Sequence, residues 1–355
     1  MIESELEAVM HTNSEQYAEN ILMQYGVKPE LLQKYSNNVW RVGTKAGNYA
    51  LKKIDKSRAY SLFMNIHSLS QRGVGSVVPI YKTQQGYYFV EDYSDSYYLM
   101  PWVEHQEERE VDYKDSLMFK QLANLHRQTV EEKDYELEAI TSFYEKTKID
   151  WRQEEDKLAM FVNDCEKRIY MSPFELQVCT YSNEIRNAQR FALQKLETWY
   201  EEIKEIKKHR TSTNHGGVSF HHFVKDEGGR GYFLSWERAK KGAPANDLIT
   251  FYHRYLRTYP MYCDDCIDWY FEYNKAFPLK DHEKALAFAY LAYPRSFIQV
   301  LNSFIEDTRL KRKKGDRQYV TRLTQSYWLA KNIEYVAGRM NQIEEQKKAE
   351  STQSS

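Results

Sequence analysis

The stretch that decides the fold is Asn214–Glu237, which has the sequence NHGGVSFHHFVKDEGGRGYFLSWE. It contains two β-rich runs on either side of turn-forming residues from Asp226 to Gly231, and this pattern predicts a short hairpin. The residues before the hairpin are rich in histidine and glycine. Helical patterns enclose the hairpin on both sides.

The chain around this hairpin is mostly helical in pattern from Val111 onward. Apolar residues recur at three- and four-residue spacing in two long segments, as in helices packed on one face. They are Leu117, Leu122 and Leu125 in the first segment, and Ile185, Ala188, Ala192, Leu196, Trp199, Ile203 and Ile206 in the second. A further helical pattern runs from Asp247 to about Gln346, with breaks at Pro260 and Pro278.

The N-terminal part is different, because β-rich runs dominate it. Thr12 and Asn13 predict the start of a first helix, and Gly26 predicts its end. NVWRV and YALKKI, joined by turn residues 45–48, predict an antiparallel hairpin. A helix is expected from about Ser57 to Gln71, followed by strands over VVPIYKT, YYFVED and SYYLMPWVE.

The bulk composition excludes several classes of protein. Of the 355 residues, 42% are hydrophobic and 28% are charged, as is ordinary for a folded globular protein. The formal net charge of -1 gives no global field that favours nucleic acid or an anionic membrane. The sequence starts without a secretory signal, and no apolar run approaches the ~20 residues that span a bilayer. We therefore expect cytosolic synthesis, no nucleic-acid binding and no membrane insertion, while the 29 tyrosines suit a protein with adhesive surfaces.

Two local motifs leave alternatives. Cys263 and Cys266 form a C-x-x-C pair, which occurs in zinc and redox sites, but no second Cys or His pair lies nearby in the sequence. Packing within a helix is therefore favoured over a metal or redox role. The basic run RLKRKKGDR would suit an acidic partner, although a solvated loop between helices is the favoured interpretation.

A small β-rich part followed by a large helical part with one hairpin is the organisation of the kinase plan, in which the first part grips nucleotide and the hairpin presents catalytic groups. From about Asn37 to Gly338 the chain resembles the aminoglycoside and choline phosphotransferase superfamily. Within it, the chain is most similar to the kinase-like spore coat proteins of endospore-forming bacilli, the CotS family and its YsxE-like branch. The motifs are SNNVWRV and YALK, with Lys52 in place of the phosphate-gripping lysine, YYLMPWVE as the hinge, LANLH, NHGGVSFHHF, YFLSWE and PANDL.

The resemblance implies an α+β, protein-kinase-like fold of the aminoglycoside phosphotransferase type, with two lobes. A small antiparallel-sheet N-lobe would span residues 31–103, after an N-terminal helical extension over residues 1–30. A large helical C-lobe would span residues 104–346 and hold the degenerate catalytic hairpin at 213–237. Residues 347–355 are expected to form a disordered tail.

The hairpin departs from the family at the residues that carry its chemistry. Family enzymes have H-G-D and an asparagine five residues later; the aspartate accepts the proton of the attacking hydroxyl, and the asparagine helps to hold metal. Here His215 and Gly216 are present, but Gly217 stands in the place of the aspartate and His222 in that of the asparagine. Loss of a positioned base typically costs about 10²- to 10⁴-fold in rate.

The metal-binding segment departs as well. The family strand that brings an aspartate to magnesium corresponds to LSWE, in which Ser235 has no charge for a hard cation. Glu237 stands at the second acid of that pattern and, on an alternating strand, would share a face with Ser235. His221 and His222 could join Glu237 only around a metal that accepts imidazole, and nothing completes a zinc set. No metal site is therefore expected.

Three further family positions are Lys52, His215 and Asp247. No Asp or Glu lies within Lys56–Arg72, so the usual acidic partner of the lysine is missing from the following helix. Lys52 is the candidate for nucleotide contact; the alternatives are that it is an ordinary exposed strand residue, or that Lys53 takes the position. The resemblance implies structural roles for His215, as a buried hydrogen-bonded ring, and for Asp247, as a brace of the catalytic loop.

Resemblance and losses together imply a catalytically degenerate kinase-fold protein that acts as a structural or assembly component of the bacterial spore coat. It would be made in the mother-cell cytoplasm and join other coat proteins, without a cofactor, and its interlobe cleft leaves room for a small-molecule ligand. Two alternatives stay open. One is a divergent kinase that uses ATP and magnesium on a sugar or amino-alcohol, and the other is a nucleotide-binding module without turnover.

Overall fold

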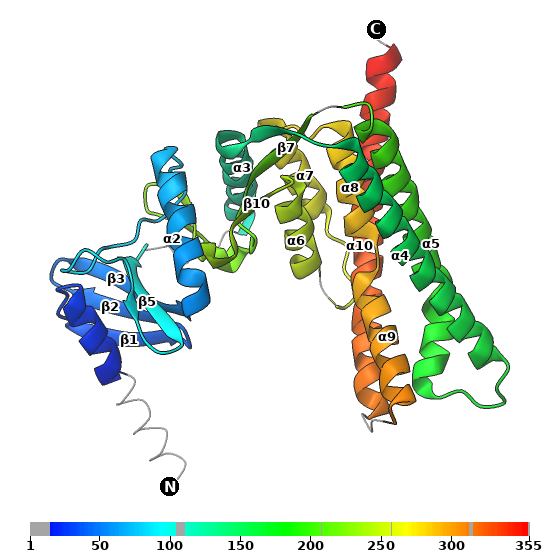
Figure 1. The fold of residues 1–355 in the computed structure, drawn as a ribbon, viewed down its shortest axis with the longest axis horizontal. Coiled ribbons are helices and arrows are strands. Elements are labelled where there is room, and N and C mark those ends of the chain that lie inside the picture. Colours follow the sequence, from blue (N-terminus) through cyan, green and yellow to red (C-terminus); the bar gives the residue numbers. More distant parts are fainter. Residues whose placement is uncertain (1–14, 104–110, 207, 257, 312–314, 354–355) are drawn as a thin grey trace. The chain divides into compact units, whose positions relative to one another are not determined.

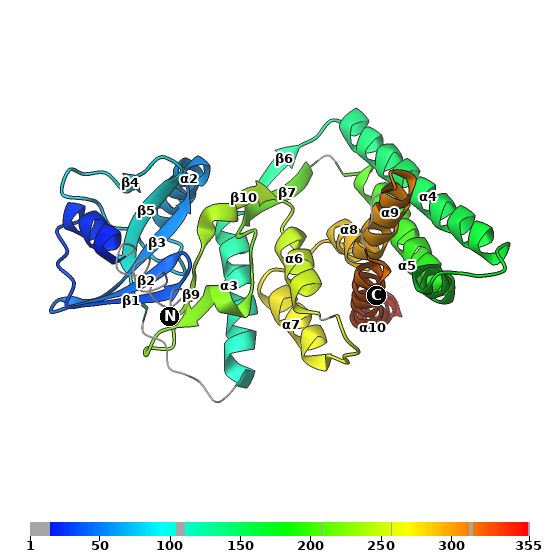
Figure 2. The same ribbon diagram turned by 90° about the horizontal axis from the view of Figure 1, so that it is seen from below.

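The computed structural model describes residues 15–103, 111–206, 208–256, 258–311 and 315–353. The chain forms two compact units, the first from residues 1–129 and 215–240, and the second from residues 130–214 and 241–355 (Figures 1 and 2). The chain therefore builds most of the first unit, enters the second, returns to the first for the hairpin and ends in the second. The lobe boundaries expected from the sequence follow a different partition and stay a prediction.

The first unit is built on a five-stranded sheet with the order β1-β2-β3-β5-β4. Its strands are β1 (Leu31–Ser36), β2 (Val39–Thr44), β3 (Gly47–Asp55), β4 (Val90–Glu91) and β5 (Asp95–Pro101). Neighbouring strands are antiparallel throughout. The predicted hairpin of NVWRV and YALKKI is confirmed as β2 and β3.

A helix over residues 15–24 packs on one face of this sheet (Figure 1). Its apolar residues form one buried cluster with residues of the strands. The cluster comprises Ala18, Ile21, Leu22, Tyr25, Trp40, Val42, Leu51, Val90, Tyr97 and Leu99. The predicted end of the helix at Gly26 is confirmed, since this residue has a φ of 72°, which favours glycine. The predicted start at Thr12 and Asn13 lies outside the described residues.

Helix α2 (Lys56–Gln71) follows β3 directly and confirms the helix expected there. The Asp55 side chain caps it by accepting a hydrogen bond from the Ser57 amide at 2.8 Å. One apolar face is buried, at Ala59, Leu62, Ile66 and Leu69. This spacing of three and four residues is that of an amphipathic helix on a sheet.

The strands expected after α2 form only in part. VVPIYKT is not a strand and makes a single bridge, between Val77 and Phe233, because Pro79 has no amide hydrogen for a ladder. YYFVED is a strand only at Val90–Glu91. The pattern also failed to predict β1, since LLQKYS is mostly exposed and lacks the alternation of a half-buried strand.

The predicted hairpin of the deciding stretch is confirmed, as β8 (Phe223–Lys225) paired antiparallel with β9 (Gly231–Phe233). Two short 3₁₀ turns flank it, η1 (Phe220–His222) before β8 and η2 (Trp236–Arg238) after β9. The Phe233 amide donates to the Ser76 carbonyl at 2.8 Å, which joins the hairpin to the segment after α2. Helix α3 (Val111–Thr129) lies beside β9 (Figure 2).

The second unit is a bundle of helices. Its helices are α4 (Leu137–Glu166), α5 (Pro173–Ile203), α6 (Ala245–Tyr255), α7 (Asp264–Ala276), α8 (Asp281–Ala292), α9 (Arg295–Arg309) and α10 (Asp316–Gln353). The long helices α4, α5 and α10 lie side by side (Figures 1 and 2). The predicted apolar face is confirmed from Ile185 to Ile203, because two buried clusters share α5 along its length, whereas Ile206 lies beyond the end of the helix. No helix in the described part of the chain is long and apolar enough to cross a bilayer.

A small three-stranded sheet with the order β10-β7-β6 accompanies these helices. It is formed by β6 (Glu131–Asp134), β7 (Lys208–Asn214) and β10 (Lys240–Gly242). The sequence pattern does not predict these strands, because EEKD, KHRTSTN and KKG carry no apolar alternation.

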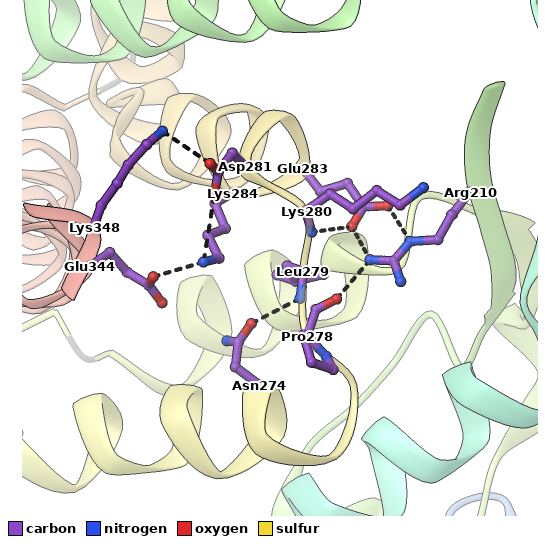
Figure 3. A network of polar contacts seen from close by, with 10 residues as sticks. All are labelled: Arg210, Asn274, Pro278, Leu279, Lys280, Asp281, Glu283, Lys284, Glu344 and Lys348. Atoms are coloured by element: carbon purple, nitrogen blue, oxygen red, sulfur yellow. Dashed lines mark hydrogen bonds and ion pairs between the residues drawn. The ribbon is translucent and has the colours of Figure 1, made fainter. Parts of the chain in front are cut away.

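A buried ion pair joins β7 to the start of α8 (Figure 3). Arg210 forms an ion pair with Glu283, and their side chains are 14% and 7% exposed. Arg210 also donates to the Pro278 carbonyl at 2.8 Å. The Glu283 carboxylate accepts from the Lys280 amide at 2.8 Å, so one carboxylate both pairs the arginine and caps α8.

Helix α10 continues beyond Gln346, where the sequence suggested the start of a tail. Two ion pairs on either side of Gln346 join α10 to α8, from Lys284 to Glu344 at 2.7 Å and from Lys348 to Asp281 at 2.9 Å (Figure 3). The basic run RLKRKKGDR spans the end of α9 and the start of α10, and its residues 312–314 lie outside the described residues.

The two leucines Leu196 and Leu176 on α5 test the core assignment with one substitution. Leu196 is fully buried and Leu176 is 59% exposed. Leu196→Ala should lower the free energy of unfolding by about 2–5 kcal/mol, because it leaves a cavity. Leu176→Ala should change it by less than about 0.5 kcal/mol. Urea unfolding followed by far-UV circular dichroism measures both, and equal effects would contradict the assignment.

Candidate functional site

Lys52 lies on the central strand β3, where the sheet register fixes its direction. It stands opposite Tyr98 on β5. Its neighbour Leu51 packs in the core on the face of the sheet that the helix over residues 15–24 covers. Because successive residues of a strand point to opposite faces, Lys52 points to the other face. Lys52 is only 9% exposed, unlike an ordinary surface lysine. Lys53 instead forms an ion pair with Asp95 at 3.7 Å, near the surface.

Lys52 reaches the segment that follows β9. Its Nζ lies 2.6 Å from Oγ of Ser235 and forms an ion pair with the carboxylate of Glu237. The side chains of Lys52 and Glu237 are each 11% exposed, so water is nearly excluded from the pair. Glu237 thus supplies the acidic partner that α2 does not contain.

The backbone between β9 and η2 passes through one left-handed residue. Ser235 has φ 69° and ψ 56°, a conformation that residues other than glycine seldom adopt. The expectation of an alternating strand across Ser235 and Glu237 is wrong, because Glu237 belongs to η2. Both side chains nevertheless contact Lys52, since the turn directs the chain back toward β3.

Tyr98 completes this cluster and helps to set its charge. Its hydroxyl donates to Oε1 of Glu237 at 3.1 Å. Burial alone would raise the pKa of Glu237, but the charge and hydrogen bonds of Lys52 and Tyr98 outweigh burial and hold this pKa below its usual value. Burial, followed by the nearby carboxylate, raises the pKa of Tyr98 well above that of a free phenol. At neutral pH the cluster is therefore a carboxylate, an ammonium and two neutral hydroxyls.

Gly216 allows the loop before the hairpin to approach η2 closely. It has a φ of 73°, and a Cβ at this position would lie 2.2 Å from the Arg238 carbonyl oxygen. Only glycine fits such an approach. The backbone therefore requires the glycine of the H-G motif at this position, whether or not the chain catalyses a reaction. Gly217 follows it and brings no side chain to the position of the family base.

His215 is fully buried inside the first unit. Its Nε2 lies 2.7 Å from the Leu234 carbonyl. The ring packs edge-on against Trp236, with centroids 4.8 Å apart, and lies near Phe233 at 5.4 Å. Trp236 is itself 2% exposed, and its indole donates to the Phe233 carbonyl at 2.9 Å. These rings form a packed cluster that joins the loop, β9 and η2.

His222 contacts the loop backbone. Its Nδ1 lies 2.8 Å from the Gly217 carbonyl, so this nitrogen carries the proton and donates. His221 beside it is exposed. Among the described residues no group of three or more His, Cys, Asp or Glu side chains could hold a metal ion.

Asp247 belongs to the second unit, in the first turn of α6, and is fully buried. Burial raises the pKa of Tyr273 well above the usual value, and the charge of Asp247 is the next largest cause. The structure thus brings Lys52, Ser235 and Glu237 together within the first unit, while Asp247 lies in the other.

Sequence reasoning missed three contacts of this site. The sequence indicates Glu237 as a candidate metal ligand and not as the partner of Lys52, because the family pattern places that partner on the helix after the lysine. Tyr98 lies in a run of apolar strand residues, and only the β3–β5 register shows that it faces Lys52. Asn65 on α2 donates to the Ala239 carbonyl at 2.9 Å, which joins α2 to the end of η2.

Chemically, the cluster balances its own charge. An incoming phosphate would have to compete with Glu237 for the Lys52 ammonium, and charge-assisted contacts of this kind are among the stronger hydrogen bonds in proteins. Ser235 offers a neutral hydroxyl where a cation would need an acid. The cluster is well suited to hold the hairpin segment against the sheet.

This architecture is that of small-molecule kinases of the aminoglycoside phosphotransferase type, which confirms the predicted fold class. An aminoglycoside phosphotransferase from Alicyclobacillus acidocaldarius superposes with a TM-score of 0.65 over 92% of this chain and 96% of its own, at 12% identity. A microcompartment-associated aminopropanol kinase gives 0.53 over 92% and 98%, at 12% identity. A spectinomycin phosphotransferase, solved with ADP and spectinomycin, gives 0.50 over 90% and 98%, at 11% identity.

These likenesses show the fold alone, because the sequences have diverged so far. No sequence-family model matches the chain, and no curated protein sequence does.

The charge state of Glu237 predicts how stability depends on pH. Glu237→Gln should lower the free energy of unfolding by about 3 kcal/mol at pH 7, because it leaves the Lys52 charge buried without its partner. Since the folded pKa of Glu237 is depressed, its contribution is present above the unfolded pKa of about 4.3 and is lost as the pH falls through the folded pKa. The difference between wild type and variant should therefore shrink below about pH 4.3.

Urea unfolding at pH 7 and at several lower values measures this difference. Glu91→Gln is the matched control, because Glu91 forms an exposed ion pair with Lys56 at 2.8 Å, and surface pairs contribute about 0–1 kcal/mol. A Glu237→Gln effect no larger than that of the control, or one that persists unchanged at low pH, would count against the charge state described for the pair.

Proposed function

We propose that this chain is a catalytically inactive kinase-fold protein in which the nucleotide-gripping lysine serves the structure. The observation that carries the proposal is the buried pair of Lys52 and Glu237, closed by Ser235 and Tyr98. The same lysine has no aspartate opposite it at Ser235, and the loop has no base at Gly217. The groups that would accept a proton and hold magnesium in phosphoryl transfer are replaced at both places.

The biological role follows from the sequence resemblance and is a proposal of its own. The motifs from SNNVWRV to PANDL resemble kinase-like coat proteins of the CotS family, for which a structural or assembly role in the spore coat is expected. Exposed aromatic side chains support such a role, because Tyr and similar rings favour protein contacts. In the first unit Tyr60, Tyr87 and Tyr93 are 75%, 66% and 99% exposed. Other coat proteins are the proposed partners, and the coat is the proposed destination after synthesis in the mother cell.

A divergent small-molecule kinase is the second candidate, and one observation favours it. Lys52 and a carboxylate are still side by side in a fold shared with an aminopropanol kinase. In that case Glu237 would have to release Lys52 to phosphate and bind magnesium itself, with ATP as the phosphate donor and a sugar or amino-alcohol as the acceptor.

Thermal unfolding with Mg-ATP separates the two candidates. If the chain is inactive, Mg-ATP should not shift the unfolding temperature of the wild type. Binding of Mg-ATP at a concentration of 100 times its dissociation constant would stabilise the fold by about 2.7 kcal/mol. Glu237→Gln should gain ATP binding, because Lys52 is then released from its counter-charge. Adding Lys52→Met should remove that gain.

If the chain is a kinase, Glu237→Gln should change ATP binding in the opposite direction. The wild type would show a magnesium-dependent shift and transfer labelled phosphate to an alcohol acceptor, and Glu237→Gln would lose both. Stabilisation of the wild type without label transfer would instead identify a nucleotide-binding module.

Localisation tests the coat proposal separately from catalysis. A fusion of the full chain to a fluorescent protein in a sporulating bacillus should move from the mother-cell cytoplasm to a shell around the forespore, and should extract with the coat fraction. The fluorescent protein alone is the control and should stay diffuse. A fusion that also stays diffuse through spore maturation would refute the coat assignment and leave the Mg-ATP result unaffected.

A further inference from the structure

The pair Cys263 and Cys266 lies at the start of α7, in the second unit, and the proposed function does not use it. Cys263 is the N-cap residue of the helix, and Cys266 lies in its first turn. Both side chains are thiols and are buried, with 6% and 0% exposure. Their Sγ atoms are 2.6 Å apart, whereas the bond in a disulfide is about 2.05 Å long. A bond between them therefore requires little movement of the side chains.

Hydrogen bonds from two other helices hold this segment in place. The hydroxyl of Tyr252 on α6 donates to the Cys266 carbonyl at 2.8 Å. Asn332 on α10 donates to the Tyr259 carbonyl at 2.8 Å and accepts from the Met261 amide at 3.0 Å. The backbone that carries the two thiols is thus positioned by tertiary contacts, and their proximity does not depend on α7 alone.

The other two cysteines provide a comparison within the same chain. Burial raises the pKa of the Cys165 thiol to about 12, and it also raises that of Cys179. The pKa of Cys263 is lowered, because the Cys266 thiol donates a hydrogen bond to its sulfur, against the effects of burial and of the two aspartates that follow it. Since the thiolate is the reactive form, Cys263 is more nucleophilic at neutral pH than Cys165 or Cys179.

We propose that Cys263 and Cys266 form a reversible dithiol–disulfide site that is oxidised by a low-molecular-weight disulfide such as oxidised glutathione. Cys263 attacks, because it is the more exposed of the two and accepts the hydrogen bond. Cys266 resolves, because it is fully buried and its sulfur lies next to that of Cys263. A zinc site is the competing use of such a pair, but it needs further ligands, and the described residues contain no group of three or more metal-binding side chains.

The reaction balances as a two-electron exchange. The Cys263 thiolate attacks one sulfur of oxidised glutathione, the glutathione S–S bond breaks, and one glutathione thiolate leaves and takes up a proton. Cys266 then loses its proton and attacks Sγ of Cys263 in the mixed disulfide, and the second glutathione leaves. Two protein thiols are oxidised to one disulfide, and one oxidised glutathione is reduced to two molecules of glutathione.

The test uses the full chain in its native state. Reduced protein is equilibrated at pH 7 in buffers of increasing ratio of oxidised to reduced glutathione, quenched with acid, denatured, alkylated and mapped by peptide mass spectrometry. Wild type and the matched control Cys165→Ser/Cys179→Ser should both lose two alkylatable thiols in one transition. The peptide that carries Cys263 and Cys266 should then escape alkylation. Its mass should be two hydrogen atoms below that of the unalkylated dithiol peptide.

Two single variants report on the order of the steps. Cys266→Ser should accumulate a mixed disulfide between Cys263 and glutathione, because the resolving thiol is gone. Cys263→Ser should carry no glutathione on Cys266, since Cys266 is fully buried.

The peptide map of the wild type decides the matter even where a variant fails to fold. Full alkylation of Cys263 and Cys266 at every glutathione ratio, oxidation that occurs only after denaturant is added, or a stoichiometric zinc ion that protects both thiols would overturn the proposal. A disulfide confined to Cys165 and Cys179 would overturn it as well.

Discussion

A buried ammonium group must have a counter-charge, and the first unit depends on how Lys52 meets this requirement. The carboxylate is that of Glu237 in η2, which follows the hairpin in the sequence. Tyr98 and Ser235 complete the polar contacts of the pair. Leaving either charge unpaired in this place would cost several kcal/mol. The pair therefore specifies that the segment after β9 returns to β3, and other close contacts depend on that return: Gly216 against Arg238, His215 against Leu234, and Asn65 against Ala239.

The same arrangement shows how a kinase-like fold can hold its lysine with a different acidic partner. In the kinase plan a lysine is oriented by an acid on the next helix and is then available to phosphate. Here helix α2 has no acid, and Glu237 takes over from a different part of the chain. The architecture still superposes on phosphotransferases at 12% identity. The fold therefore does not by itself specify the chemistry.

The sequence predicted those elements whose pattern is local. The β2–β3 hairpin, α2, the amphipathic face of α5 and the β8–β9 hairpin each have caps, turns or periodic apolar residues that mark them. The polar strands β6, β7 and β10 and the exposed edge strand β1 carry no such pattern and were missed. At the site, the positions of Lys52, Gly217, His222, Ser235 and Glu237 were found by motif. The partnership of Lys52 with Glu237 and Tyr98 was not found, because it depends on strand register and on one left-handed residue, neither of which a motif records.

The division of the chain has a consequence for how the protein is made. The first unit is interrupted by residues of the second, so Lys52 and its contact Ser235 are 183 residues apart in the sequence. At a synthesis rate of about 5–20 residues per second, the ribosome needs about 10–40 s to travel from one to the other. During that interval the lysine has been translated, but its counter-charge has not. Completion of the first unit must therefore wait for a segment that emerges only after much of the second unit has been synthesised.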